Sequence, residues 1–349
     1  MQIRLLVIFA AAISVAGLLT ACSKGSPSPG DGSTADIGAG LSGPHGAAAT
    51  VVASGLKNVS GLAEDGNGRL WATTAAFTDN GTDGLFVVTS PGAAPIEVVA
   101  GLHTPMGLLW IGDKLYVSST EGVLVFSGFD GTKFASEQTL ATFNGAGILG
   151  GMVLGSDGRI RLGISSPCDN CQPPSKWAAA VVSFLPDGTD ARVEASGIRA
   201  PVGLAYVPGT NDLLVTMNQR DDLGDVTPGD YLAQVSSGQN WGFPGCYGQG
   251  GTACNGVPAA VAELDKHAAV SGVAVVSSSA GTSAYLAEWA TGKVLQVKLN
   301  GSSGSYTGKP QTFITGVQSP VPIVASGGHA LLIGDWATGT VYRVTLPGS

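Results

Sequence analysis

The densest group of charged side chains lies between Met217 and Tyr231, in the segment MNQRDDLGDVTPGDY. It holds four aspartates and an arginine, although charged residues make up only 12% of the chain. Four carboxylates in one loop repel one another unless cations or N–H groups pair with them. Arg220 can pair with one, turn N–H groups can take others, and the spacing of an EF-hand calcium loop is absent. We therefore expect a loop held mainly by aspartate–backbone bonds, with calcium binding by these side chains as the alternative.

Four of the five cysteines form two closely spaced pairs. Cys168 and Cys171 belong to the motif CDNC, and Cys246 and Cys254 lie eight residues apart in a glycine-rich stretch. In an oxidising compartment two local disulfides are the expected outcome. The alternative is a zinc ion bound by all four cysteines, which requires the two pairs to meet in space, because no histidine stands at ligand spacing.

The composition indicates an all-β chain without a nucleic-acid partner. The 349 residues include 53 glycines, and 44% of the residues are hydrophobic, which is ample for a core with many turns. The net charge is −8 and no Lys/Arg cluster occurs, whereas phosphate binding needs a basic surface. The motifs GxSxG and HExxH and a phosphate-binding glycine loop are absent as well.

Residues 1–21 are typical of an export signal. Arg4 precedes the apolar stretch LLVIFAAAISVAGLL, and the segment ends at the small-residue site LTAC. Cys22 has the position of the lipid-modified cysteine of a bacterial lipoprotein; an ordinary secretory signal is the alternative. Residues 22–48, rich in Pro, Gly and Ser, are expected to form a flexible tether. The protein is then exported and anchored by lipid to the extracytoplasmic face of a bacterial membrane.

Repeats indicate a propeller. EWATGKVLQV and DWATGTVYRV place Trp289 and Trp336 47 residues apart. A glycine followed by apolar residues begins five units, and a proline takes its place in the sixth. These positions are Gly61, Gly107, Gly151, Gly203, Gly272 and Pro322. Each unit contains four short apolar stretches between turn signals such as DGNG and PDG, so that residues 49–349 are predicted to form a six-bladed β-propeller.

The ring is expected to close through pairing of the two ends of the propeller. TVVASGL, which begins at Thr50, supplies the outer strand of the last blade, whose own sequence stops after VYRVTL. This pairing removes an exposed strand edge. Two stacked β-sandwiches are the alternative fold, but they leave the recurring glycine unexplained.

Propellers bind ligands at the mouth of the central channel, where the inner strands begin. Four or five residues before each unit's first position stand mostly polar or basic residues. They are Lys57, His103, Gly147, Arg199, His267 and Gln318. Five of these six have a side chain able to bind a ligand, which predicts a functional pocket. Ordinary loop residues that happen to be polar are the alternative.

Four motifs resemble those of a known family. GIRAPVGLAYVP, NQRDDLGDVTPGDYLAQVSSGQNWGFPGCYG, SSPCDNC and DKHAAVSGVAV together look like the glucose/sorbosone dehydrogenases, and the resemblance spans most of residues 49–346. These enzymes are six-bladed propellers that oxidise sugars with pyrroloquinoline quinone (PQQ) and calcium. The resemblance implies that the backbone carbonyls of Gln219 and Arg220 bind calcium. It also implies cofactor binding by the mouth residues Arg199, His103, Lys57, His267 and Gln318.

The position of the family's catalytic base is altered. In the family a histidine takes the proton of the sugar hydroxyl, ten residues before the Asp-Gly turn of the third blade. Counting back from Asp157 places Gly147 there, and glycine has no side chain to accept a proton. His103, from the adjacent blade, is the alternative base, because a neutral imidazole suits that role.

Three other polar positions of the family pattern are lost at Ala200, Tyr231 and Ala233. Two function classes follow. The first is an oxidoreductase of the family with an altered active site. The second is a catalytically inactive, membrane-tethered propeller that binds a sugar, a glycan or a protein partner. An open basic pocket with His103 and Arg199 converging favours the first class, and an exposed aromatic patch on one rim favours a protein partner.

We expect the substitution Cys22→Ala to release the protein from the membrane fraction, because the lipid on this cysteine is the predicted anchor. Cell fractionation followed by immunoblotting measures the distribution, and Ser23→Ala, one residue away, is the matched control. A Cys22→Ala protein that stays with the membranes contradicts the assignment.

Overall fold

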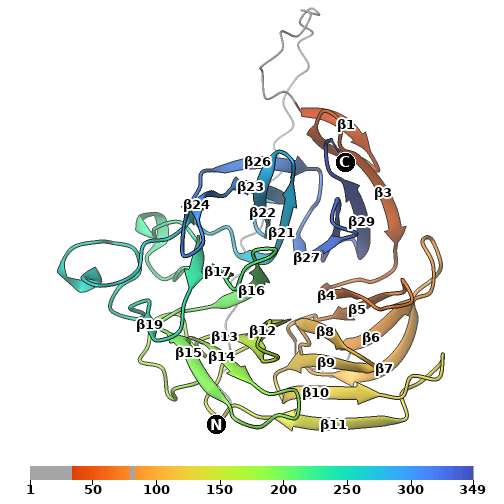
Figure 1. Ribbon diagram of the computed structural model, residues 1–349, viewed down its shortest axis with the longest axis horizontal. Coiled ribbons are helices and arrows are strands. Elements are labelled where there is room, and N and C mark those ends of the chain that lie inside the picture. The colour runs from red at the N-terminus through yellow and green to blue at the C-terminus, as the bar shows by residue number, and fades with distance from the viewer. Residues whose placement is uncertain (1–33, 79–82, 349) are drawn as a thin grey trace, which may run out of the picture. The chain divides into compact units, whose positions relative to one another are not determined.

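The computed structural model describes residues 34–78 and 83–348. Within these ranges the chain is all-β with two short 3-10 helices, and six sheets stand around a central channel (Figure 1). The six-bladed propeller prediction is confirmed. The predicted signal peptide and Cys22 lie outside the described residues. No helix in residues 34–78 and 83–348 is long and apolar enough to cross a membrane.

Blades one to three follow one another along the chain, each with antiparallel strands ordered from the channel outward. They consist of β4 (Val59–Glu64), β5 (Leu70–Thr74), β6 (Asp83–Val88) and β7 (Ile96–Leu102); β8 (Gly107–Ile111), β9 (Lys114–Ser119), β10 (Gly122–Ser127) and β11 (Ser136–Ala141); and β12 (Leu149–Leu154), β13 (Ile160–Ile164), β14 (Ala180–Phe184) and β15 (Arg192–Ser196). The short strand β19 (Gln239–Asn240) adds a parallel edge to blade three.

Blades four to six follow the same plan. They consist of β16 (Pro201–Tyr206), β17 (Leu213–Met217), β18 (Tyr231–Val235) and β20 (Ala262–Glu263); β21 (Val270–Ser278), β22 (Gly281–Glu288), β23 (Lys293–Lys298) and β26 (Pro310–Thr315); and β27 (Pro320–Ser326), β28 (Ala330–Asp335), β29 (Thr340–Thr345) and β3 (Ala48–Ala53). A hairpin, β24 (Asn300–Ser302) and β25 (Ser305–Thr307), extends from blade five, and the helices are η1 (Gly224–Val226) and η2 (Thr252–Cys254).

The six predicted blade positions all lie in the innermost strands, and the structure explains the glycines. A Cβ added to Gly107 would lie 2.6 Å from the carbonyl oxygen of Gly150 in the next blade. One added to Gly203 would lie 2.5 Å from the carbonyl oxygen of Ser271. Such distances are too short for a side chain, so glycine is required where neighbouring inner strands touch through their backbones.

Hydroxyl side chains on the second strands join adjacent blades at these contacts. Ser118 Oγ accepts the Gly107 N–H at 2.8 Å and donates to the Gly150 carbonyl at 2.6 Å. Thr216 Oγ1 does the same in blade four, with Gly203 N at 2.8 Å and the Ser271 carbonyl at 2.6 Å. Each buried hydroxyl thereby satisfies one backbone group on either side of the seam between two blades.

The faces between blades are filled by large apolar side chains. Trp71 on β5 is fully buried, and its ring packs edge-on against Trp110 of blade two and Phe129, with centroids 5.2 and 4.9 Å away. Its indole N–H donates to Asp65 in the preceding turn at 2.8 Å, so the buried polar atom has a partner.

The two ends of the propeller pair in blade six, as predicted. β3 is antiparallel to β29, with Thr50 opposite Arg343, and is the outer strand of that sheet. Figure 1 shows the red-to-orange β3 beside the dark-blue β29. The last blade therefore has its fourth strand only through this exchange.

Residues 34–44 differ from the predicted tether, because they form β1 (Thr34–Gly38) and β2 (Leu41–Pro44), which continue the outer edge of blade five. Ile37 and Leu41 are buried at 7% and 1% exposure. The glycines that suggested flexibility make the turn instead: Gly38 and Gly40 have φ values of +94° and +77°. Two apolar residues in a glycine-rich stretch give no alternating pattern from which strands could be predicted.

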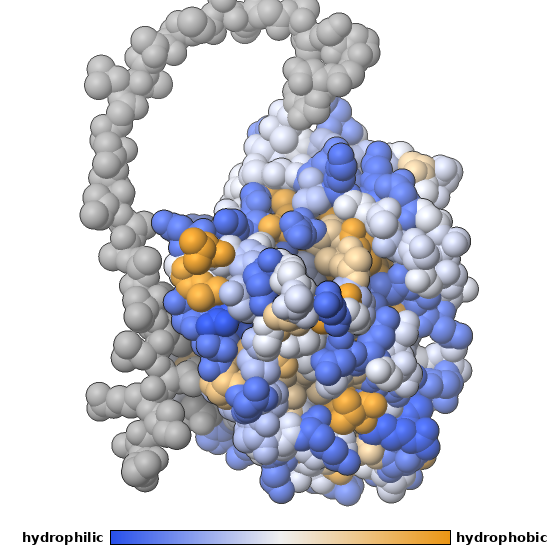
Figure 2. Space-filling model, turned by 90° about the vertical axis from the view of Figure 1, so that its left-hand side faces the viewer, coloured by the Kyte–Doolittle hydropathy of each residue, from blue (hydrophilic) through white to orange (hydrophobic). Residues whose placement is uncertain are grey.

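The side of the propeller that carries β24 and the loops after β18 is mostly hydrophilic. Figure 2 shows small, separate groups of hydrophobic residues there, divided by hydrophilic ones. Such scattered apolar residues are ordinary for a surface in contact with water, and this side offers no reason to place a ligand on it.

We expect Gly203→Ala to lower the free energy of unfolding by about 1–3 kcal/mol, because the new methyl group must push two inner strands apart. Gly66→Ala is the matched control: its added Cβ meets no atom within 4 Å, so the change should stay within about 0.5 kcal/mol. Urea unfolding of both variants measures the midpoints. Equal midpoints would show that the inner strands can separate without cost.

Candidate functional site at the channel mouth

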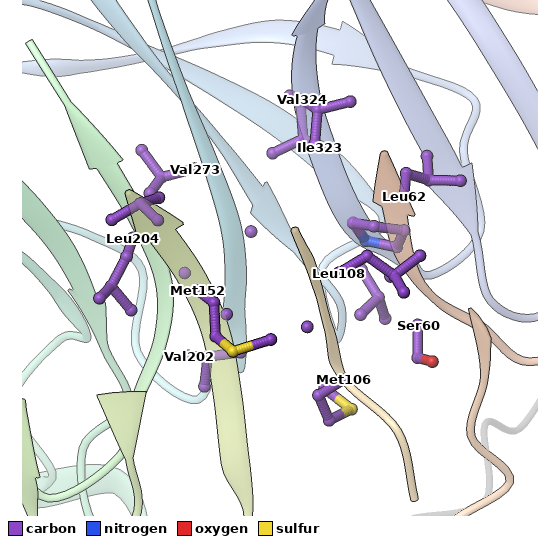
Figure 3. A pocket seen from close by; sticks show the side chains of 18 residues that line it. Ser60, Leu62, Met106, Leu108, Met152, Val202, Leu204, Val273, Ile323 and Val324 are labelled. Atoms are coloured by element: carbon purple, nitrogen blue, oxygen red, sulfur yellow. The ribbon is translucent and has the colours of Figure 1, made fainter. Parts of the chain in front are cut away.

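The channel is apolar below its mouth. A cavity of about 140 Å³ lies between the inner strands, and none of its lining side chains is charged. Figure 3 shows aliphatic and methionine side chains around it, and the labelled ones are Ser60, Leu62, Met106, Leu108, Met152, Val202, Leu204, Val273, Ile323 and Val324. Charged chemistry is therefore found in the loops at the mouth and not in the channel.

The predicted mouth residues lie in the segments that lead into the inner strands, as expected. Lys57, His267 and Gln318 are exposed, and His103, Gly147 and Arg199 are half-buried. The structure brings Arg199 and His267 together on residues 218–230, the connection between β17 and β18, which we call the mouth loop. His103 and Gln318 have contacts outside the mouth loop: His103 Nε2 is 3.7 Å from Glu121 Oε1, and the Gln318 N–H donates to Asp335 at 2.9 Å.

The mouth loop contains an internal Asp–Arg pair, in which Arg220 pairs with one of the aspartates. Arg220 Nε and Nη2 each donate to the Asp222 carboxylate at 2.6 Å, and the guanidinium lies 4.8 Å from the ring centroid of Tyr247. The Arg220 hydrogen bond holds the pKa of Asp222 below its ordinary value, and the same contact raises the pKa of Arg220. The pair is a bidentate ion pair that stiffens the start of the loop.

A second carboxylate, from outside the mouth loop, completes the site. Asp169 lies between the two cysteines of CDNC, and its carboxylate forms an ion pair with Arg199. The same carboxylate accepts the N–H groups of Asp221 and Asp222 at 3.0 and 2.8 Å. Arg199 Nε also donates to the Asp169 carbonyl at 3.0 Å. Asp169 was not predicted as a site residue, because its partners are 30 to 53 positions away.

The carbonyls predicted to bind calcium do not fit the ion in this arrangement. Arg199 Nη1 donates to the carbonyls of Asn218 and Gln219 at 3.2 and 2.8 Å, so a cation already faces them. The Arg220 carbonyl accepts the Thr227 hydroxyl at 3.0 Å. Calcium takes six to eight oxygen ligands. Among the described residues, no group of three or more His, Cys, Asp or Glu residues could hold a metal ion.

His267 holds the far half of the mouth loop. Its Nδ1 lies 3.0 Å from Asp221 Oδ1 and its Nε2 lies 2.9 Å from the Gly224 carbonyl. Both neighbours are acceptors, so the imidazole satisfies both only when both ring nitrogens carry a proton. The Asp221 hydrogen bond, followed by that to Gly224, accordingly raises the pKa of His267 above 6.5.

A buried carboxylate anchors both ends of the mouth loop to blade five. Asp230 accepts the Gln219 N–H at 2.8 Å and the Val270 N–H at 3.0 Å. Burial raises the pKa of Asp230 to about 6, and the two N–H donors lower it only partly. Asp230 therefore fixes the two ends of the loop, and the N–H groups of Asp221 and Asp222 between them donate to Asp169.

Gly147 has no room for a side chain. A Cβ there would lie 2.5 Å from the Ser166 carbonyl oxygen and 2.8 Å from that of Ser165. The Gly147 N–H donates to the Ser165 carbonyl at 3.0 Å. The residues just before the CDNC motif thus lie directly beside Gly147, the position of the family's catalytic base. A histidine at this position would require them to move.

The three other departures from the family pattern have structural surroundings. Ala233 is fully buried in β18, and the Ala200 carbonyl accepts the Asn218 N–H at 3.2 Å. Tyr231 stacks on Trp241 with ring centroids 5.5 Å apart, and burial raises its pKa. These side chains serve packing, and none of them supplies a polar group to the mouth.

Three aromatic residues at the mouth were not predicted as site residues. Phe77, Trp336 and Trp289 stand after the second strands of blades one, six and five, with centroid distances of 6.4 and 5.9 Å along the row. Phe77 is 43% exposed, and Trp336 Nε1 donates to the Ala75 carbonyl at 2.8 Å. The WATG repeat was the signal that could have identified this row, since it puts both tryptophans at the same place in their blades.

Both expected disulfides are present in the structure. Cys168 is bonded to Cys171 and Cys246 to Cys254, with Cα–Cα distances of 6.0 and 5.0 Å. The zinc alternative, which needs the two pairs to meet at one metal, does not apply to cysteines bonded in this way.

Comparison with known proteins shows similarity of fold alone. Neither protein-family models nor curated proteins match the sequence. Solved structures do match in fold: the PQQ domain of pyranose dehydrogenase from Coprinopsis cinerea, in its holo form, has 16% identity and a TM-score of 0.72, covering 87% of this chain and 97% of that one. The chain thus has the six-bladed architecture of PQQ-dependent sugar dehydrogenases.

Two further structures extend the comparison. The PQQ-bound aldose sugar dehydrogenase from Streptomyces coelicolor has 19% identity and a TM-score of 0.68, covering 87% of this chain and 99% of that one. A calcium structure of a Trichoderma reesei carbohydrate-active enzyme of family AA12 has 15% identity and a TM-score of 0.72, covering 88% and 97%. At these identities the likeness establishes the fold, and PQQ and calcium belong to the neighbours.

We expect Asp221→Asn to lower the pKa of His267 toward 6.5, because the anionic acceptor of its Nδ1 proton is lost. NMR titration of the His267 ring protons in the parent and the variant measures the shift. In the parent, the protonated ring stabilises the mouth loop fully below pH 6.5, and this contribution is lost as pH rises through the raised folded-state pKa. Asp225→Asn, on the same loop, is the control; an unchanged pKa in Asp221→Asn contradicts the assignment.

Proposed function

We propose that the protein is a lipid-anchored, extracytoplasmic binding propeller on the sugar-dehydrogenase fold, and that it does not oxidise sugars as its structural neighbours do. Its ligand is a sugar, a glycan or a partner molecule of the cell envelope, taken at the channel mouth. The observation that carries the proposal is that Arg199 already forms an ion pair with Asp169 and donates a hydrogen bond to the Gln219 carbonyl.

The contacts of Arg199 support this function over cofactor-dependent catalysis. The guanidinium is the one predicted cofactor contact that lies deep in the mouth, with 16% of its side chain exposed. It already has a carboxylate and three carbonyl oxygens as partners. An incoming anionic cofactor would have to displace Asp169, and calcium would have to displace the guanidinium, so both lose contacts that the protein supplies to itself.

The aromatic row supports a binding role. Phe77 is exposed and Trp336 and Trp289 are half-buried, on three adjacent blades at the mouth side, and aromatic residues are enriched where proteins meet ligands and partners. A sugar or glycan can place its apolar C–H face on such rings, and a protein partner can place apolar side chains there.

One observation favours the second candidate, an oxidoreductase with an altered site. His103 Nε2 lies 3.7 Å from Glu121 Oε1, so a carboxylate stands beside the imidazole and can orient the ring. In this candidate His103 takes the proton from the sugar hydroxyl in place of the residue missing at Gly147, while the oxidant is the quinone of the structural neighbours.

We expect no saturable heat in calorimetric titration with PQQ in the presence of calcium, and oxidation of glucose and other aldoses that is absent or very weak. Loss of a positioned general base alone removes about 10²–10⁴-fold of rate. The dye-linked assay is run beside the Streptomyces coelicolor aldose sugar dehydrogenase as positive control. Brisk oxidation by the parent that disappears in His103→Ala would establish the second candidate.

The binding half of the proposal is tested separately. Titration with mono- and oligosaccharides should change the tryptophan emission of the parent, because two tryptophans lie in the aromatic row. Phe77→Ala should weaken that binding by about fivefold, as expected for removal of one stacking contact of roughly 1 kcal/mol. Ile96→Ala is the control, because it removes an exposed apolar side chain from β7. Its affinity for the sugar should equal that of the parent.

A further inference from the structure

The segment Ser165–Cys171, which we call the disulfide loop, is positioned to control the mouth. Its first part is fixed by backbone bonds: the Ser166 N–H donates to the Arg199 carbonyl at 2.7 Å, and the Ser165 carbonyl accepts the Gly147 N–H. Its second part, Asp169 and Asn170, lies between the bonded cysteines. Both of these side chains face the mouth loop.

The near half of the mouth loop depends on those two side chains. The Asp169 carboxylate receives the N–H groups of Asp221 and Asp222, and the Asn170 side chain bonds to the Asp222 carboxylate. Packing contributes little there, since the side chains of Asp221 and Asp222 are 70% and 41% exposed. The Arg220–Asp222 pair and the His267–Asp221 contact hold the side chains of this half, whereas its backbone N–H groups at Asp221 and Asp222 are held by Asp169.

The Cys168–Cys171 bond is what restricts Asp169. Opening it gives the residues between the cysteines the freedom of an exposed loop, and a carboxylate that must reach Arg199 and two N–H groups together loses its preorganisation. Both cysteines are half-buried, so a small dithiol can reach the sulfur atoms.

We propose that the Cys168–Cys171 disulfide is a redox latch: oxidised, it holds Asp169 on Arg199 and closes the mouth loop over the channel; reduced, it releases both. This inference rests on the proposed function, because it names the regulation of the same mouth. In the step, a dithiol reductant transfers two electrons and two protons. Its thiolate attacks one sulfur, the S–S bond breaks through a mixed disulfide, both cysteines become thiols and the reductant becomes a disulfide.

Release changes what the mouth can bind. Without Asp169, the Arg199 guanidinium and the N–H groups of Asp221 and Asp222 form a donor set free to take an external acceptor. His267 and Asp230 still hold the far half and the base of the mouth loop, so the reduced state is a local opening and the blades stay folded.

Hydrogen–deuterium exchange of the full protein, without ligand, tests the latch. Treatment with dithiothreitol should raise exchange at the Asp221 and Asp222 amides about tenfold, the effect of losing one charge-assisted hydrogen bond. The double variant Cys168→Ser/Cys171→Ser should show the raised exchange without reductant and no further rise with it. Asp169→Asn, which keeps the shape of the side chain, should raise exchange while its disulfide stays closed.

Cys246→Ser/Cys254→Ser is the matched control, because reduction opens this second disulfide too. It should leave the Asp221 and Asp222 amides as protected as in the parent, and these should still respond to dithiothreitol. Unchanged exchange in reduced parent and in Cys168→Ser/Cys171→Ser would overturn the latch. Loss of protection across all six blades in these proteins would overturn it as well, because the opening must be local. The readout needs no ligand, so it stands whether or not PQQ binds or sugars are oxidised.

Discussion

The close approach of the six inner strands is the constraint on which the rest of the structure depends. Backbone meets backbone there, at distances that admit no side chain at Gly107 or Gly203. Ser118 and Thr216 then satisfy the polar groups that this contact leaves between blades. Because the ring is narrow and apolar at its centre, charged groups are excluded from the channel and gather in the loops at its mouth.

The mouth loop shows how a charge-poor protein places charge where it is needed. Three of its four aspartates have defined partners: Asp222 pairs with Arg220, Asp221 faces His267, and Asp230 is buried on backbone N–H groups. These three carboxylates avoid mutual repulsion because each has its own donor. Only Asp230 is held by backbone N–H groups, as predicted for most of the loop, whereas Asp221 and Asp222 contact the side chains of His267 and Arg220. What changes the chemistry is the added carboxylate of Asp169.

The parts of the fold that repeat could be predicted from sequence, and the parts that occur once could not. Gly61 and its four glycine counterparts mark five of the blades because close contact with the neighbouring inner strand recurs in each, and Pro322 takes the place of the glycine in the sixth. β1 and β2 could not be predicted, because two apolar residues among glycines show no alternating pattern. At the site, Arg199 and His267 were predicted by their place before inner strands. Asp169 was not, since its role depends on a loop 52 residues further along the chain that only the folded ring brings near.

The course of the N-terminal strands has a mechanical consequence. β1 and β2 lie on the edge of blade five, whereas β3, a few residues later, completes blade six, so this short stretch connects blade five to the strand that closes the ring. A pull applied at Thr34 acts first on the β1–β2 hairpin, whose bonds break one after another from its free end. The load reaches β3 only after that hairpin has opened and its slack has been drawn out. Opening of the hairpin thereby protects the β3–β29 pairing from tension applied on the N-terminal side.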